Sequence, residues 1–344
     1  MQGGVPAPVA AAVEGQIGLA GTDSPNHGRG QALRRAGMAW PRAPGTRSPG
    51  RIGVGNGDPQ SRRAWCHGGV RTRYRGAMTD PFPQRIVCLT EESTETLYLL
   101  GEQDRIVGIS GFTVRPPRAR KEKPKVSAFT SAKVHEIERL EPDLVIGFSD
   151  IQADIAAALI RRGIEVWVSN HRSVAGILAY MRRLGAMVGA DDRARDLCRR
   201  AQAHLDLVAA QAARLPRRPR VYFEEWDEPN ISGIRWVSEL LAIAGGDDVF
   251  PELARESLAK GRILADPLEP ARRDPDIVIG SWCGKKFRPD HVAARPGWAD
   301  VAAVRDGELH EVKSALILQP GPAALFDGID ALSAIIQRWA ARRG

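Results

Sequence analysis

A near-duplicate hexapeptide constrains the fold of this chain more than any other feature. Residues 142–147 read PDLVIG, and residues 275–280 read PDIVIG. Upstream of each copy, an apolar stretch typical of a strand leads into a stretch typical of a helix, within residues 85–101 and 220–246 respectively. Two similar units of this kind predict two α/β lobes. The cleft between two lobes is a natural place for a small ligand to bind.

The basic charge of the chain is confined to its first residues. The formal net charge is +8, and it falls within residues 1–77, so the rest of the chain is neutral. A neutral body lacks the footprint of a nucleic-acid-binding domain, and we expect no nucleic-acid partner. Residues 1–83 are rich in Gly, Pro, Ala and Arg without hydrophobic periodicity, which predicts a disordered leader. We interpret it as an over-extended start, with Met78 as the alternative start, or as a transit peptide.

Several classes of site and segment are disfavoured by the sequence. No later window is apolar over the roughly 18 residues of a membrane span, so we expect no direct membrane insertion. The Cys residues form no CxxC pair, and His135, His171 and His291 lack metal-ligand spacing, so we predict no metal site and no cofactor. Cys283 has no base near it in sequence, which disfavours a catalytic nucleophile.

The order of strand-like and helix-like segments predicts a mainly parallel sheet in each lobe. We place the first lobe at residues 84–172, connecting helices at 173–216 and the second lobe at 217–344. Apolar residues recur every three or four positions from Asp191 to about Leu215, which predicts one long amphipathic helix between the lobes. The predicted strands are residues 85–89, 106–110, 144–147 and 165–169 in the first lobe, and 220–224, 277–280 and 308–312 in the second.

Three further strings accompany this order of elements. They are residues 140–147 (LEPDLVIG), 245–250 (GGDDVF) and 295–298 (RPGW). Together with the order of elements, they resemble the iron-chelate and cobalamin substrate-binding proteins of ABC importers, nearest to the cobalamin branch, over about residues 84–341. The resemblance implies an α/β fold of two Rossmann-like lobes joined by a single long connecting helix, with the ligand cleft between the lobes.

The resemblance also implies a function. It implies a monomeric receptor without enzymatic activity that binds cobalamin or a related corrinoid. The corrinoid is then the ligand and not a cofactor, and the expected partner is an ABC permease. In the cobalamin branch one acidic residue per lobe docks on the permease. Asp154 lies at the similar place in the first lobe, whereas the second lobe carries Ile234 and Arg235 there, with Glu239 one turn later.

The loops beyond the carboxyl ends of the strands are the expected ligand contacts. Trp226 and Trp282 each follow a strand among polar residues, and we predict that a planar ligand stacks on them. The alternative is that each ring seals the end of its own sheet. The same two interpretations, contact with the ligand or sealing of the sheet, apply to Phe129 and Phe148.

Polar residues in the same loops complete the predicted site. Glu92 precedes a helix, where it contacts the ligand or caps the helix. Ser149 follows a strand, and Glu225 ends a strand beside Trp226. Lys285 either meets polar groups of the ligand or lies in a solvated loop.

Two other functions remain open from the sequence. An iron-chelate receptor, for a siderophore or haem, is favoured if the cleft is basic rather than aromatic. A cytosolic enzyme or regulator on the same scaffold is the other alternative, because fold does not fix function. The sequence as given shows no signal peptide, which favours the cytoplasm, whereas the resemblance implies the periplasm.

Overall fold

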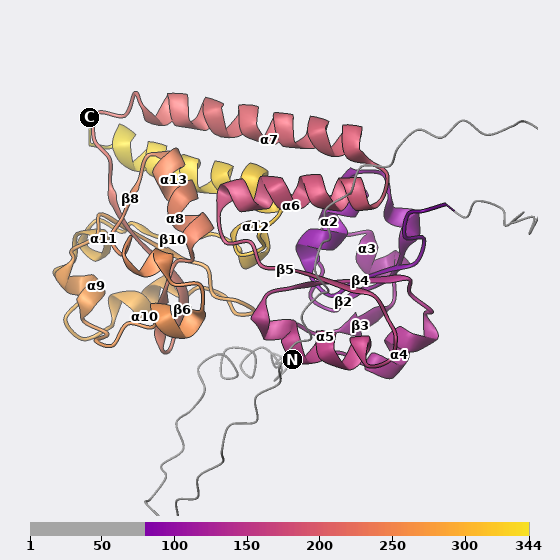
Figure 1. Cartoon of the computed structure of the whole chain (residues 1–344). Helices are drawn as coiled ribbons and strands as arrows, with labels where there is room; N and C mark the ends of the chain where they lie inside the picture. Colours follow the sequence, from indigo (N-terminus) through magenta and orange to yellow (C-terminus); the bar gives the residue numbers. More distant parts are fainter. Residues whose placement is uncertain (1–79, 344) are drawn as a thin grey trace, which may run out of the picture. The chain divides into compact units, whose positions relative to one another are not determined.

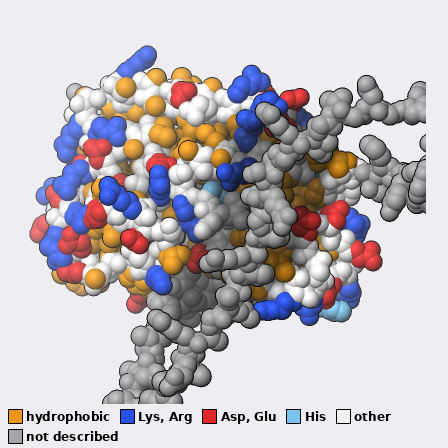
Figure 2. Space-filling view, viewed as in Figure 1, with side chains coloured by type: hydrophobic (Ala, Val, Ile, Leu, Met, Phe, Trp, Pro, Cys, Tyr) orange, Lys and Arg blue, Asp and Glu red, His pale blue; other side chains and the backbone are white. Residues whose placement is uncertain are grey.

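The computed structural model describes residues 80–343. The leader predicted for residues 1–83, including the alternative start Met78, therefore lies outside the described residues except for its last four positions. On the face seen in Figure 2, basic and acidic side chains are interspersed.

The first sheet contains five parallel strands (Figure 1). Its order is β3-β2-β1-β4-β5, so the chain moves to opposite sides of the sheet after β1 and after β4. The carboxyl ends of β1 and β4 are thus the point where the strand order reverses, which is where α/β sheets bind ligands. The strands are β1 (Ile86–Cys88), β2 (Ile106–Ser110), β3 (Lys125–Ser127), β4 (Leu144–Phe148) and β5 (Val166–Ser169).

The second sheet has the order β10-β9-β6-β7, with the short β8 also paired to β6. All of its pairs are parallel except the β6–β7 hairpin. The strands are β6 (Arg220–Asp227), β7 (Asn230–Ser232), β8 (Asp247–Asp248), β9 (Ile277–Gly280) and β10 (Leu309–Glu311). This arrangement, with the first sheet, confirms the predicted α/β class and its two lobes.

Helices cover both faces of both sheets. In the first lobe α2 (Glu91–Leu99) and α3 (Ala119–Glu122) cover one face, and α4 (Val134–Arg139) and α5 (Ala153–Ile160) the other. The connecting helices are α6 (Val174–Met187) and α7 (Asp191–Ala212). The second lobe adds α8 (Arg235–Ala244), α9 (Glu269–Arg272), α10 (Pro289–Ala293), α11 (Ala302–Arg305), α12 (Ser314–Ile317), a π-helical turn (Ala324–Gly328) and α13 (Ile329–Ala341). The last predicted helix, residues 323–341, is therefore split into that turn and α13.

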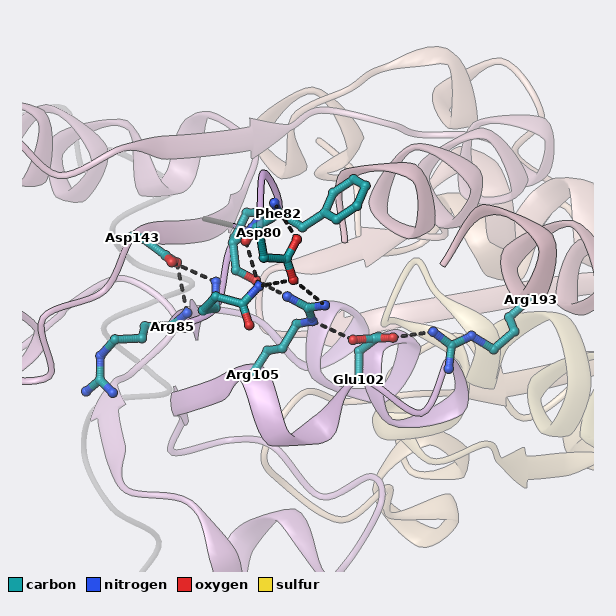
Figure 3. Close-up of polar contacts among 9 residues, drawn as sticks. Asp80, Phe82, Arg85, Glu102, Arg105, Asp143 and Arg193 are labelled. Carbon is teal, nitrogen blue, oxygen red and sulfur yellow. Dashed lines mark hydrogen bonds and ion pairs between the residues drawn. The ribbon is translucent and has the colours of Figure 1, made fainter. Parts of the chain in front are cut away.

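The repeated hexapeptide has the same structural role in both lobes. The Asp143 carboxylate accepts the backbone N–H groups of Gln84 and Arg85 at 2.6 and 2.9 Å, just before β1 (Figure 3). Asp276 accepts the N–H of Arg220 at 2.8 Å, at the start of β6. Each aspartate thus holds the beginning of the first strand of its lobe against the strand that follows the aspartate.

One apolar core runs through both lobes, and we refer to it as the shared core. Strand residues alternate between faces: Val221 and Phe223 of β6 enter the shared core, whereas Tyr222 enters a separate core of the second lobe. In the first lobe Ile86 enters the shared core and Val87 a separate one. Residues of α6, α7, α8 and α13 join the two contributions into one cluster.

The α6–α7 pair is the physical connection between the lobes. Ser173 caps α6 by accepting the N–H of Gly176 at 3.0 Å. A side chain at Gly185 would lie 2.2 Å from the Cβ of Ala194, so only glycine allows α6 and α7 to approach this closely. The α7 helix ends at Ala212, three residues before the predicted end. It packs against α6, α8 and α13 (Figure 1). On its predicted apolar stripe, Leu197, Leu205 and Val208 are buried.

A polar chain reinforces the first-lobe end of this connection. Arg105 contacts Asp80 at 3.6 Å and donates to Glu102 at 2.5 Å. Glu102 in turn pairs with Arg193 in the first turn of α7 (Figure 3). The start of the described chain, the first lobe and α7 are therefore linked by one charged network.

Two leucines on α7 test the role of its apolar stripe. Leu205 is 2% exposed and Leu207 is 57% exposed. We expect Leu205→Asp to lower the free energy of unfolding by at least about 3 kcal/mol, because it buries an unpaired charge. Leu207→Asp should change it by no more than about 1 kcal/mol, because the Leu207 side chain is exposed. Both variants lose the same helix propensity, so the difference between them reports the effect of burial. Urea denaturation measures both, and equal losses would contradict a packed connecting helix.

Candidate ligand-binding cleft

A cleft of about 290 Å³ lies between the lobes, at the carboxyl ends of the strands of the first sheet. From the first lobe, its wall takes residues that follow β1, β2, β3, β4 and β5. From the second lobe, it takes the end of β6, the start of α8, residues 257–262, the turn after β9 and residues 314–320. The reversal of strand order between β1 and β4 therefore opens directly into the cleft.

Four aromatic rings line the cleft. Phe112, Phe129 and Phe148 belong to the first lobe, and Trp236 to the second. The indole Nε1 of Trp236 donates to the carbonyl oxygen of Ile317 at 2.8 Å, which fixes the ring within the second lobe. Phe112 and Phe129 are half-buried, so their rings remain accessible from the cleft. Such walls suit a large ligand with flat or apolar surfaces.

The first half of α2 brings three glutamates into the protein, and Glu91 and Glu92 of its first turn line the cleft. Burial, with the neighbouring charges of Glu92 and Glu95, raises the pKa of Glu91 to about 8. Burial also raises the pKa of Glu92 to about 7, although the Thr90 hydroxyl donates to its Oε1 at 2.5 Å. The pKa of Glu95 is raised by burial as well. The Glu91 carboxyl is thus mainly uncharged near neutral pH, despite the acidic sequence.

The two arginines on the wall are already engaged by the protein. Arg262 is 1% exposed and donates to Glu225 Oε2 and to the carbonyl oxygen of Ser232, both at 2.5 Å. The Arg172 guanidinium lies 3.5 Å from Asp150 and stacks over the Phe148 ring at 4.7 Å. Neither arginine therefore presents a free positive charge to the cleft.

Polar contacts across the lobes fix the back of the cleft. His171 Nε2 donates to the carbonyl oxygen of Pro320 at 2.7 Å, and burial lowers the pKa of His171 to about 4. The neutral ring accepts the Ser169 hydroxyl at Nδ1. Arg115 donates to Glu95 Oε1 at 2.7 Å and also pairs with Asp327 of the second lobe. These contacts, with the shared core, hold one lobe against the other.

Five of the residues predicted from the sequence lie on the cleft wall: Glu92, Phe129, Phe148, Ser149 and Glu225. They come from both lobes, so the structure brings them around one cavity. Arg172, Trp236 and Arg262 also line it, although the sequence reasoning did not select them. Trp236 could have been selected from its position at the start of a predicted helix. Helices that start at this edge of the sheet place their first residues beside the cleft.

The structure places Trp226, Trp282 and Lys285 away from the cleft wall. Both indoles are buried in the separate core of the second lobe, at 9% and 4% exposure, as in the alternative in which each seals its own sheet. The Trp282 Nε1 donates to Glu224 at 3.0 Å. Lys285 pairs with Asp227, and its ammonium lies 4.2 Å from the Trp226 ring centre. Strand alternation explains this, because Trp226 shares the face of Tyr222, away from the shared core.

The acidic residues considered for docking differ in availability. Asp154 is exposed in the first turn of α5. Glu239 instead accepts the N–H of Val174 at 2.7 Å and pairs with Arg235 at 2.8 Å. Glu239 thus fixes the start of α6 to the second lobe.

Within residues 80–343 no three His, Cys, Asp or Glu side chains are grouped as a metal site would need. In the same part of the chain, no helix combines the length and the apolar character of a membrane span.

Comparison with known sequences identifies relatives over most of the described chain. The family model for periplasmic binding proteins matches residues 86–316. A vitamin B12-binding protein of Vibrio vulnificus is 25% identical over 170 residues, covering 48% of this chain and 62% of that protein. A cobalamin-binding protein of Halobacterium salinarum is 25% identical over 219 residues, covering 58% and 54%. The chain therefore spans less than two thirds of the length of these two relatives.

A third relative matches over a longer stretch. An uncharacterised ABC transporter substrate-binding lipoprotein of Bacillus subtilis is 24% identical over 266 residues, covering 73% of this chain and 79% of that protein.

Solved structures share the fold. A periplasmic vitamin B12-binding protein of Vibrio cholerae has a TM-score of 0.61 at 19% identity, covering 75% of this chain and 98% of that chain. The apo form of a periplasmic haem-binding protein of Roseiflexus has a TM-score of 0.64 at 23% identity, covering 74% and 99%. Proteins with different ligands therefore share this architecture.

The buried glutamates predict a fall in stability as pH rises. From the ordinary glutamate pKa of 4.5 up to about 7 and 8, the unfolded chain is ionised while folded Glu92 and Glu91 still hold protons. Unfolding then releases protons, so stability is lost as pH rises through the folded pKa values. Below the ordinary histidine pKa of 6.5, the lowered pKa of His171 acts in the opposite direction. We therefore expect the melting temperature to fall between about pH 6.5 and pH 9, and Glu91→Gln and Glu92→Gln to flatten the fall.

Glu165 provides the control, because it is an exposed glutamate of the same lobe. Glu165→Gln should retain the slope of the unmodified protein in differential scanning calorimetry. An identical slope in all three variants would show that Glu91 and Glu92 do not hold protons in the folded state.

Proposed function

The chain belongs to the periplasmic binding protein family, and we propose that it is the substrate-binding component of an ABC importer whose ligand is cobalamin or a related corrinoid. The single observation that carries this proposal is the cleft between the lobes, whose walls hold four aromatic rings and whose arginines are paired. Relatives named for vitamin B12 or cobalamin binding support the same ligand class.

The charge of the cleft favours a corrinoid over an iron chelate. Anionic siderophores and the carboxylates of haem are expected to need free cationic partners. Here Arg262 is paired with Glu225, and Arg172 lies beside Asp150. Of the side chains that usually ligate haem iron, the described wall residues include no His, Tyr or Met, and Cys283 is the one Cys among them. An uncharged, amide-bearing macrocycle fits these walls better.

We propose that the ligand contacts include Glu92, Phe129, Phe148, Ser149 and Glu225, together with Trp236. The rings supply apolar contact area, and the hydroxyl and carboxyl groups fix the orientation of the ligand. We propose that the loop after β9 is supported by Trp226, Trp282 and Lys285, which do not contact the ligand. The family carries solutes and the proposed role is binding, so we propose no enzymatic activity for this chain.

Docking on a permease would use the exposed Asp154 of the first lobe. The second lobe offers no equivalent at Glu239, because that side chain is held by Val174 and Arg235. We therefore propose that contact with a permease is asymmetric, with a carboxylate on the first lobe only.

Truncation of the half-buried rings tests the ligand. We expect cyanocobalamin to bind the full chain and to quench its tryptophan fluorescence, because Trp236 lies on the wall. Phe112→Ala and Phe129→Ala should each weaken binding by about 1–3 kcal/mol, the range for a well-packed aromatic contact. Isothermal titration calorimetry gives the affinities.

Two exposed leucines provide a matched control. Leu258, 37% exposed, lines the cleft, whereas Leu268, 41% exposed, does not. Leu258→Ala should weaken binding and Leu268→Ala should not. Absence of cyanocobalamin binding by the unmodified chain would refute the corrinoid proposal, and equal affinities in all the variants would move the ligand away from this cleft.

The shared core predicts that the lobes move little on binding. A continuous apolar core resists a hinge motion, because opening would expose the surface that α6 and α7 bury. We expect the radius of gyration from small-angle X-ray scattering to be the same with and without cyanocobalamin. A clear compaction on adding the ligand would contradict the shared core as a rigid connection.

A further inference from the structure

Two loops, one from each lobe, flank the mouth of the cleft. They are residues 111–118, between β2 and α3, and residues 257–262 of the second lobe. Val114 of the first loop and Leu258 of the second are the large apolar wall residues that remain exposed, at 40% and 37%. Because the shared core resists rotation of one lobe against the other, a ligand has to pass between these loops.

The loop of the second lobe is held by buried contacts. The Arg262 guanidinium donates to Glu225 Oε2 and to the carbonyl oxygen of Ser232, both at 2.5 Å, and the residue is 1% exposed. Ile263, directly after the loop, forms an antiparallel bridge with Ile231 of β7. Breaking a buried ion pair is costly, because it leaves an uncompensated charge inside the protein. This loop is therefore a fixed part of the wall.

The loop of the first lobe is connected to the second lobe through one arginine. Arg115 donates from Nε to Glu95 Oε1 at 2.7 Å, and its Nη2 pairs with Asp327 in the π-helical turn of the second lobe. Glu95 Oε2 accepts the backbone N–H of Ala323 at 3.0 Å, just before the same turn. Among the described residues, the polar connection between residues 111–118 and the second lobe therefore depends on the Arg115 guanidinium.

Arg115 also determines where the cleft-lining side chains of its loop lie. Arg120 Nη1 donates to the two carbonyl oxygens on either side of Phe112, at 2.6 and 2.9 Å, and fixes the beginning of the loop to the first lobe. Phe112 and Val114 both line the cleft. Val114 lies between the Arg120 contacts and Arg115, so its place at the mouth depends on the Arg115 contacts that follow it.

The contact between Arg115 and Asp327 is weaker than the buried contacts of Arg262, because solvent reaches it. The side chains of Arg115 and Asp327 are 33% and 52% exposed. Exposed ion pairs contribute little to stability and are screened by salt. Loss of such a contact frees a loop without unfolding the lobe beneath it, and loop movements of this kind commonly limit the release of a bound molecule.

We propose that Arg115 is a positioning residue whose contact with Asp327 holds residues 111–118 over the mouth of the cleft and slows the release of the bound ligand. This inference rests on the proposed function and adds how the ligand leaves. When the Arg115–Asp327 contact breaks, Phe112 and Val114 move away from the second lobe while both lobes keep their orientation. The loop of residues 257–262 stays in place.

The test measures the dissociation rate of cyanocobalamin from the full chain, by the recovery of tryptophan fluorescence after rapid dilution. Cyanocobalamin has no net charge, so salt acts on the protein rather than on the ligand. For the unmodified chain we expect the rate to rise as sodium chloride increases from about 0.05 M to about 0.5 M, because salt screens the exposed pair. Asp327→Asn should raise the rate about two- to fivefold at low salt and remove this salt dependence.

Three further variants show whether the effect belongs to this pair. Asp327→Glu keeps the charge and should retain the slow rate and its salt dependence. Asp330→Asn removes another exposed acid, which pairs with His204, and should behave as the unmodified chain. Arg115→Gln should release the ligand at least as fast as Asp327→Asn. The melting temperature of Asp327→Asn should stay within about 3 °C of the unmodified chain, so a change in rate does not reflect unfolding.

The outcomes separate this inference from the function on which it rests. Cyanocobalamin binding with the same dissociation rate and salt dependence in the unmodified chain, Asp327→Asn and Arg115→Gln would overturn the role of Arg115 and leave the corrinoid receptor intact. An equal rise in rate in Asp330→Asn would also overturn it, because the effect would not depend on this pair. Absence of cyanocobalamin binding by the unmodified chain would overturn the proposed function and this inference together.

Discussion

The shared apolar core is the constraint on which the rest of the structure depends. It takes one face of each sheet and joins them through α6, α7, α8 and α13. Because one face of each sheet packs into a common interior, the fold itself fixes the orientation of one lobe relative to the other. The cleft is rigid for the same reason. Its walls are the strand ends of two sheets that cannot turn relative to each other without exposing apolar surface.

The close approach of α6 and α7 shows how local sequence serves this core. Gly185 allows contact with Ala194, and the apolar stripe of α7 then reaches α6 and the second lobe at once. The repeated aspartates Asp143 and Asp276 act at the opposite end of the sheets. Each holds the start of the first strand of its lobe, which fixes the register of that strand against its neighbour at the amino ends of the strands. The carboxyl ends are left free to line the cleft.

The polar groups of the cleft follow from the burial that the core imposes. Glu91 and Glu92 lie in the first turn of α2, where the helix N-terminus favours acidic residues. Contact with the second lobe then removes them from water, and their pKa values rise. The arginines of the wall are paired with neighbouring acids. The result is an acidic sequence that forms a nearly uncharged, aromatic cleft, the property that separates a corrinoid from an anionic chelate in the proposed function.

The sequence by itself determined the two lobes, the parallel strands and the long helix, because hydrophobic periodicity and a repeated strand are local signals. It also identified the loops that meet at the cleft, since the carboxyl ends of parallel strands share one edge. Tertiary structure decided which side chain of each loop faces the ligand. In the loop after β9 the strand alternation sends Trp282 into the core and leaves Cys283 on the wall. Trp236 reaches the cleft only because α8 packs on the shared core. The face that a residue presents depends on packing between distant segments, which no local pattern encodes.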